Sequence, residues 1–241
     1  ISLGLVGSEM CIRDSYCTMW GGADAIWHEC GHGTAFRNRR LNKFFYNIAS
    51  FMNNFEPVRW KWSHSLHHSY TASVDPHDYE DDGSIFAKHT FLSFILNFIP
   101  GIGFFTIHKS LYVEIIKHAL GVKSDVMKDC IPEDNIIDCI YSSRIFVLLW
   151  ICIIISSIYF ATLLPILLFL VPKFFSTFNG IWGLTQHMGL QENTKDHRLS
   201  TRSVRLNPIF SFIYWKMEYH IEHHMFQICL LYTSPSPRDR G

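Results

Sequence analysis

A long apolar stretch in the second half of the chain limits its fold more than any other feature. Residues 145–187 run IFVLLWICIIISSIYFATLLPILLFLVPKFFSTFNGIWGLTQH and carry one charged side chain, Lys173, before the final histidine. A helix needs about 20 residues to cross the hydrocarbon layer of a membrane, so these 43 residues allow two crossings. Residues 145–171 are uncharged, a longer run than the core of a small soluble domain usually holds. The stretch predicts a transmembrane hairpin at about 145–187 in an all-α integral membrane protein.

The two ends of the sequence do not resemble a natural protein. The segments LVGSEMCIRDS and CLLYTSPSPRD are similar to translations of one sequencing-library adapter, read from opposite strands, and such segments are set aside before the fold is considered. We expect residues 1–15 and 229–241 to be non-native, and residues 16–228 to form one membrane domain that is truncated at both ends. Without the ends, 18 basic and 18 acidic residues remain of 21 each, so the net charge is zero and nothing favours nucleic acid as a partner.

The basic residues predict on which side of the membrane the rest of the chain lies. A hairpin crosses twice, so the segments before and after it share one side. Of the 18 Lys and Arg residues between the ends, 17 lie outside the hairpin, and such an excess is typical of cytosolic segments. We therefore expect the flanking segments in the cytosol. The turn is expected near 156–165 or at Pro172 and Lys173, and a shorter apolar run at 91–105 is expected to be interfacial or re-entrant.

Histidine is strongly clustered in this chain. Eight of the 14 histidines lie in three short motifs, HECGH, HSLHH and HIEHH, as follows: His28 and His32; His64, His67 and His68; His220, His223 and His224. In a helix, residues three or four positions apart lie on the same face, so each motif presents its imidazoles to one side. The segment between the first two motifs is too polar to cross a membrane, and the hairpin returns to its starting side. All three motifs can therefore meet, and His187 at the end of the hairpin is a further candidate.

The number of clustered histidines separates two kinds of metal site. Taken alone, His28, Glu29 and His32 fit the zinc protease signature HExxH, with Glu29 as the general base. A catalytic zinc usually takes three protein ligands, which would leave the other motifs without a role. Two metal ions with four or five ligands each would use them all. Imidazole binds zinc, copper, iron and nickel, so the ligands alone do not choose the metal; the membrane setting favours iron.

The three motifs HxxxH, HxxHH and HxxHH, with an apolar hairpin before the last, resemble those of the membrane fatty acid desaturases. The likeness extends over most of residues 27–227 and includes HHSYTASVDPHD after the second motif, QHMGLQENTKDHRLSTRSV after the hairpin, and MEYHIEHHMF at the third motif. The family fold that this implies is a set of transmembrane helices with a cytosolic helical cap that carries a histidine-rich di-iron site. The enzymes of this family lie in the endoplasmic reticulum or the bacterial inner membrane.

The resemblance also implies a reaction and its site residues. The eight motif histidines would bind two non-haem iron ions, and His187 corresponds to the additional histidine that such proteins place before the third motif. The family uses O2 and two electrons, supplied by cytochrome b5 or a ferredoxin, to introduce a double bond into a fatty acyl substrate. We expect four carboxylates to accept the free ring N–H groups of the ligands: Glu29, Asp75, Asp196 and Glu222.

Three other functions remain open at this point. A related di-iron hydroxylase of lipids would use the same ligands, and only its product would differ. A membrane zinc protease would depend on Glu29 and be indifferent to the third motif. A purely structural membrane protein would tolerate the loss of every motif.

Overall fold

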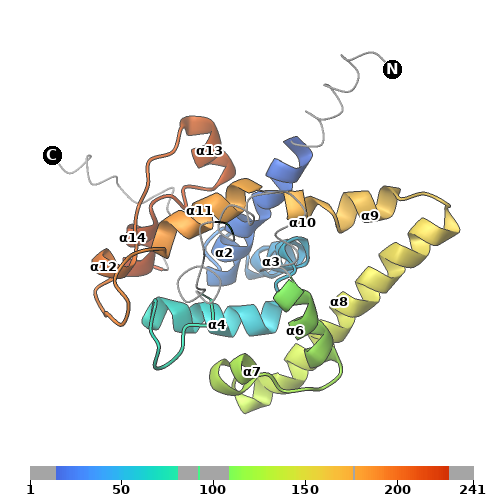
Figure 1. Ribbon diagram of the computed structural model, residues 1–241, viewed down its shortest axis with the longest axis horizontal. Coiled ribbons are helices and arrows are strands. Elements are labelled where there is room, and N and C mark those ends of the chain that lie inside the picture. Colours follow the sequence, from blue (N-terminus) through green and yellow to red (C-terminus); the bar gives the residue numbers. More distant parts are fainter. Residues whose placement is uncertain (1–14, 81–91, 93–108, 176, 228–241) are drawn as a thin grey trace.

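The computed structural model describes residues 15–80, 92, 109–175 and 177–227, and all regular structure in these ranges is helical (Figure 1). The predicted all-α class is therefore confirmed for the described part of the chain. The helices are α2 (Ala23–His32), α3 (Arg39–Asn53), α4 (Pro57–Ser69), α6 (Lys109–Ala119), α7 (Asp125–Cys130), α8 (Glu133–Tyr159), α9 (Leu164–Phe169), α10 (Pro172–Phe175), α11 (Thr177–His187), α12 (His197–Ser200), α13 (Pro208–Ile213) and α14 (His220–Met225).

The helices that carry the first two histidine motifs have ends fixed by local residues. α2 ends at Gly33, whose φ of 74° is left-handed and suits a residue without a side chain. The side chain of Asn38 accepts a backbone N–H in the first turn of α3, and the carboxylate of Glu56 accepts two in the first turn of α4. These caps set where α2, α3 and α4 begin and end, and so hold the two motifs in register.

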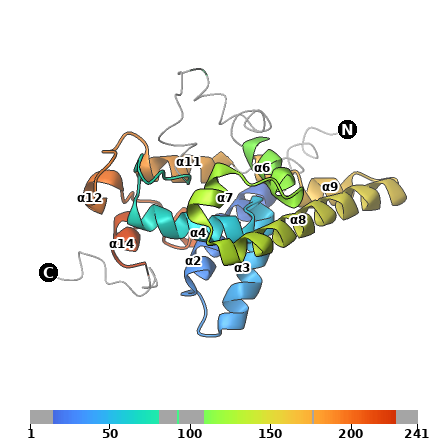
Figure 2. The same ribbon diagram turned by 90° about the horizontal axis from the view of Figure 1, so that it is seen from below.

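α8 is the one helix in the described residues that is long and apolar enough to cross a membrane. Its 27 residues span about 40 Å at 1.5 Å per residue, and it projects away from the body of the molecule (Figures 1 and 2). Its second half turns large apolar side chains outward, among them Leu148 and Ile158, which are 58% and 73% exposed. Such a surface is typical of a helix that faces lipid, not of the core helix of a soluble domain.

The second limb of the predicted hairpin differs from the expected spanning helix. After a turn at 160–163, the chain returns toward the body through three short helices, α9, α10 and α11 (Figure 1). Pro165 and Pro172 each lie in the first turn of a helix. A backbone N–H has no intrahelical acceptor in that turn, so its absence in proline costs nothing there. Inside a continuous helix, either proline would remove a hydrogen bond and break the helix. The first limb also begins earlier than 145, because Glu133 and Asp134 are favourable in the first turn of α8.

Two aromatic clusters hold α2 in the centre of the molecule. On one side, Trp27 of α2 packs edge-on against Trp60 of α4, with ring centroids 5.8 Å apart. On the other side, Ala25 of α2 packs with Trp182 of α11 and with Tyr214, which follows α13. α2 is therefore clamped between α4 and the C-terminal segment, the two parts of the chain that carry the other histidine motifs.

Two expectations fall outside the described residues. These are the interfacial or re-entrant run at 91–105, apart from Leu92, and the adapter-like ends at 1–15 and 229–241, apart from Ser15.

Candidate metal centre

The three histidine motifs meet at one place in the fold. α2, α4 and α14 come from both ends of the chain, and the end of α11 lies beside them (Figure 1). Nine histidines form two groups, and within each group the candidate ligand atoms all lie within 4.8 Å of one another. The five-histidine group consists of His28, His32, His64, His68 and His223, and the four-histidine group of His67, His187, His220 and His224.

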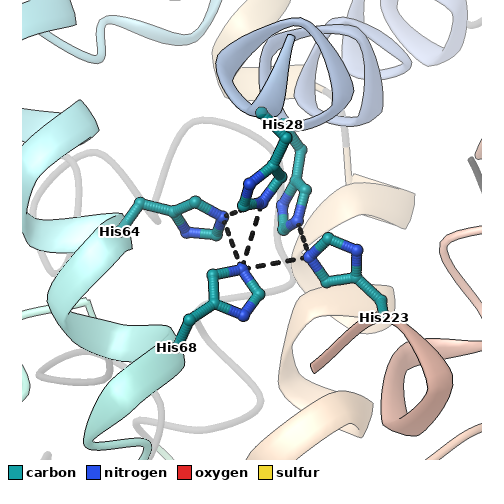
Figure 3. Close-up of side chains that lie close together, drawn as sticks. His28, His64, His68 and His223 are labelled. Carbon is teal, nitrogen blue, oxygen red and sulfur yellow. Dashed lines mark hydrogen bonds between the residues drawn. The ribbon is translucent and has the colours of Figure 1, made fainter. Parts of the chain in front are cut away.

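The rings of the five-histidine group point their nitrogens toward one another (Figure 3). The Nε2 atoms of His28 and His223 lie 2.5 Å apart, and those of His32 and His64 lie 3.0 Å apart. The Nε2 atom of His68 lies 3.0 Å from that of His64 and 3.0 Å from that of His223. All are buried except His32, which is partly exposed at the edge of the group.

The four-histidine group is fully buried and contains the one candidate that lies outside the three motifs. The Nε2 atom of His187 lies 3.0 Å from that of His220, which lies 3.2 Å from that of His224. The ring centroid of His67 is 4.9 Å from that of His187 and 4.9 Å from that of His224. The structure therefore brings His187 to the motif histidines, as the sequence analysis anticipated.

Several rings are oriented by acceptors on their other nitrogen. The Nδ1 atom of His64 lies 2.8 Å from a carboxylate oxygen of Glu80, and that of His67 lies 2.8 Å from Asp78. The Nδ1–H of His187 donates to a backbone carbonyl oxygen at 3.0 Å. A ring that donates from Nδ1 keeps the lone pair of Nε2 free to bind a metal. Neither Asp78 nor Glu80 was among the predicted carboxylates.

Burial favours the neutral form of most of these imidazoles. The pKa of His32 is lowered to about 3, first by burial and then by the neighbouring His64. Burial, followed by the surrounding histidines, also lowers the pKa values of His28, His68, His220, His223 and His224. For the carboxyl of Asp78, burial raises the pKa, but His67 and the backbone N–H groups of Ala72 and Glu80 together outweigh burial and lower the pKa to about 2. The neutral form is thus favoured for these six rings, and the carboxylates of Asp78 and Glu80 are ionised.

The two groups fit metal ions on geometry as well as on donor type. Imidazole nitrogens bind first-row metals at about 2.0–2.1 Å, so two ligands on one ion lie about 3 Å apart. The Nε2 pairs described above lie 2.5–3.2 Å apart. Where Nδ1 is the donor, as in His64 and His187, the Nε2 lone pair points into the group, and a cation there would offset the repulsion between such lone pairs. Nine imidazole nitrogens in two groups therefore match two ions bound mainly by histidine.

Among the described residues, the four predicted carboxylates have other partners or face solvent, which differs from the expected hydrogen bonds to the histidine rings. The buried Glu29 accepts the hydroxyl proton of Thr34 at 2.6 Å, and Glu222 accepts that of Ser203 at 2.7 Å. Asp75 is exposed, and Asp196 is paired with the guanidinium of Arg198 at 2.6 Å on the surface. Local pairing accounts for Glu29 and Asp196, whereas Glu222 is engaged by Ser203 from an earlier segment of the chain and Asp75 faces solvent.

Sequence reasoning missed Asp78 and Glu80 although a signal was present. Both lie in the stretch DPHDYE after the second motif, which offers three acidic residues within six positions. The turn after α4 folds back so that Asp78 also accepts the backbone N–H of Ala72 at 2.8 Å. Which of the three acidic side chains faces the histidines depends on this turn, and residue spacing does not reveal it.

The surroundings of Glu29 argue against the zinc protease interpretation of HECGH. In such a site the glutamate would act as a base on water bound to the metal. Here Glu29 is 2% exposed and its carboxylate is engaged by Thr34, five residues later. His28 and His32 share their group with His64, His68 and His223, so the motif is one part of a larger centre.

A cavity lies beside the five-histidine group. Its volume is about 220 Å³, and its lining includes three members of that group. The other lining residues include Trp27, Trp62 and Lys61, which give it mostly apolar walls with one cation. The cavity therefore offers room beside the histidines for an apolar molecule.

Comparison with known proteins identifies the family. Neither the curated proteins nor the solved structures gave a significant match. The model of the family described as fatty acid desaturase matches residues 15–229, which include all three histidine motifs, His187 and α8. The match extends over most of the chain, so this protein belongs to the fatty acid desaturase family.

Proposed function

We propose that this chain is an O2-dependent desaturase that introduces a double bond into a fatty acyl chain. The observation that carries the proposal is the convergence of nine histidines from four helices into two groups with metal-ligand spacing. The family match supports the same conclusion independently of the geometry. In the reaction, O2, two electrons and two protons are consumed, a –CH2–CH2– unit becomes –CH=CH–, and two molecules of water form.

The proposed cofactor is a pair of non-haem iron ions. One ion would be held by the five-histidine group and the other by the four-histidine group. When bound, the irons would supply the two-electron chemistry with O2 that removes hydrogen from an unactivated C–H bond. Glu80 and Asp78 would orient the rings of His64 and His67 from behind. Iron is preferred to zinc because zinc has no redox chemistry.

The proposed setting is a membrane, with the histidines on its cytosolic side. α8 supports this placement through its length and outward apolar surface, and the apolar wall of the cavity suits an acyl chain. The domain proposed to carry the activity is 16–228. Its partners would be a fatty acyl lipid or acyl-CoA and a separate electron donor, such as cytochrome b5 or a ferredoxin.

The test is expression in a host with simple lipids, together with an electron donor, followed by mass spectrometry of the fatty acids. We expect new unsaturated species that require O2 and that disappear in the variant His223→Ala. Glu29→Gln is the matched control because Glu29 lies next to a candidate ligand but contacts Thr34. Unchanged lipids from a protein that carries two irons would contradict the desaturase proposal.

A lipid hydroxylase is the alternative that the same ligands allow. It would bind the same two irons and consume O2, and the product would carry an added hydroxyl group in place of a double bond. The mass of the product separates the two, since hydroxylation adds one oxygen atom and desaturation removes two hydrogen atoms. A zinc protease, the distant alternative, would instead lose activity in Glu29→Gln.

A further inference from the structure

α3 presents an exposed apolar stripe that no described residue covers. Leu41, Phe44 and Ile48 are 42%, 57% and 42% exposed. At about 100° per residue these three positions lie within about 60° of one another, so they form one stripe along the helix. A different face of α3, which includes Tyr46 and Ala49, is buried against the protein. The stripe is therefore distinct from the face that packs in the fold.

Basic side chains accompany this stripe. Arg39, Arg40 and Lys43 of α3 and Arg37 just before it are all exposed, and none has an ion-pair partner among the described residues. No acidic residue lies between Gly33 and Phe55. A helix with an apolar stripe beside a basic face is typical of segments that lie in the headgroup layer of a membrane. Clustered Lys and Arg favour anionic lipids there.

Two contacts determine at which point along α8 the C-terminal end of α3 lies. Phe51, near the C-terminal end of α3, packs against Phe146 of α8 with ring centroids 5.8 Å apart. Phe146 comes two residues after Arg144, the last charge before the uncharged half of α8. The ammonium of Lys173, the one charge in the returning limb, donates to the side-chain oxygen of Asn53 at 3.1 Å. α3 thus meets α8 where its uncharged half begins, and meets the returning limb at its one charged residue.

The orientation of α3 relative to α8 also fits a helix that lies along the membrane surface. α3 is seen nearly end-on in Figure 1, where α8 lies along the picture, and from the side in Figure 2. Its axis therefore runs across that of α8. If α8 spans the bilayer, a helix that crosses its direction at the start of its apolar half lies along the membrane surface and not through it.

We propose that α3 is an interfacial helix whose stripe of Leu41, Phe44 and Ile48 enters the cytosolic leaflet, while Arg37, Arg39, Arg40 and Lys43 bind anionic lipid headgroups. This rests on the membrane placement in the proposed function but not on its chemistry. α3 directly follows α2, which carries His28 and His32. Lipid contact along α3 would therefore hold the five-histidine group at a fixed height above the membrane surface.

The test is photo-crosslinking of the full chain in vesicles, with adducts identified by mass spectrometry. Ile48→p-benzoylphenylalanine probes the stripe, and Asn47→p-benzoylphenylalanine is the matched control, since residue 47 is exposed but lies about 100° around the helix. Ile154→p-benzoylphenylalanine reports on α8. We expect lipid adducts at positions 48 and 154, with those at 48 several-fold above those at 47, in vesicles of phosphatidylglycerol mixed with phosphatidylcholine.

A second comparison tests whether α3 prefers anionic lipids. Adducts at position 48 should fall several-fold in vesicles of phosphatidylcholine alone, and likewise in the variant Arg39→Gln/Arg40→Gln/Lys43→Gln. Lys117→Gln/Lys123→Gln removes exposed charges elsewhere and should change nothing. Equal yields in both kinds of vesicle would overturn the preference for anionic lipid.

The remaining outcomes separate this inference from the proposed function. Lipid adducts at position 154 but not at 48 would overturn the inference alone. Protein adducts at position 48 that form only when the electron donor is added would also overturn it, because the stripe would then be a docking face for that protein. Absence of lipid adducts at both positions would overturn the membrane placement and this inference with it.

Discussion

The two histidine groups differ in how the protein holds them. In the four-histidine group, ring nitrogens of three members are engaged by the carboxylate of Asp78, the carbonyl of Ser200 and the hydroxyl of Thr71. In the five-histidine group, Glu80 contacts His64, whereas the buried Nδ1 atoms of His68 and His223 have no partner among the described residues. The cavity is lined by three members of the five-histidine group and by none of the four-histidine group.

This difference predicts different roles for the two histidine groups. Rings that are anchored from behind are already oriented before a metal binds, so the four-histidine group is the more rigid one. The five-histidine group has one ligand more, a partly exposed edge at His32, and adjoining space for a substrate. We therefore expect the four-histidine group to depend on every member, and the five-histidine group to tolerate the loss of its edge ligand.

The largest expected effect separates the groups directly. His224→Ala leaves three ligands in the buried group and should abolish activity and empty that site. His32→Ala leaves four ligands in the other group, so it should retain measurable activity with weaker iron binding. Fatty acid analysis and metal content of the two purified variants check this. Equal loss of activity in both variants would show that the two groups do not differ in this way.

The next largest effect is expected from substitution of the carboxylates that contact the histidine rings. Asp78→Asn removes the ionised partner of His67 and should lower iron affinity or activity about 10- to 100-fold. Glu80→Gln should act on the five-histidine group in the same direction, through His64. Iron titration of each variant shows which site is weakened. Asp196→Asn is the control, since Asp196 lies on the surface with Arg198, and an equal loss there would count against the assigned roles.

Acid should affect the metal-free protein through its buried histidines. The pKa of His32 is about 3 in the fold, below its ordinary value of about 6.5. Between these values the unfolded chain binds a proton that the folded chain does not, so stability is full above pH 6.5 and is lost as pH falls toward 3. Each such imidazole lowers the free energy of unfolding by about 1.4 kcal/mol for every pH unit in this range. Thermal unfolding of the metal-free chain between pH 7 and 4 measures this, and a pH-independent melting temperature would contradict it.

The smallest expected effect concerns Glu29. The amide oxygen of Glu29→Gln can still accept the hydroxyl of Thr34, so stability should change by no more than about 1 kcal/mol. Activity and the iron content of both groups should stay close to those of the unchanged protein. A large loss of activity with iron retained would mean that Glu29 acts on the reaction, and would reopen the HExxH interpretation.

Much of the site could be predicted because its signal is local. The spacing within HECGH, HSLHH and HIEHH places each set of rings on one helical face whatever the rest of the fold does, and all three motifs are helical here. His187 could be anticipated because the returning limb ends beside the third motif. The division into two groups could not, since His67 and His68 are adjacent in sequence but belong to different groups.

The rest depends on turns and packing that spacing does not reveal. Asp78 and Glu80 reach the rings through the turn after α4, and Asp196 is withdrawn by Arg198. The apolar stretch predicted a reversal but not its form, because the helix that begins at Glu133 continues to Tyr159 and the prolines divide the return into short helices. Hydropathy reports how much apolar length exists and not where helices break.

If the nine histidines hold two separate iron ions, the number of irons per chain follows from the two groups. The direct measurement is the metal content per chain of the purified protein, by elemental analysis, in the unchanged chain and in His224→Ala. We expect two irons per chain in the unchanged protein and one in the variant. A single zinc per chain that His224→Ala leaves in place would contradict this expectation.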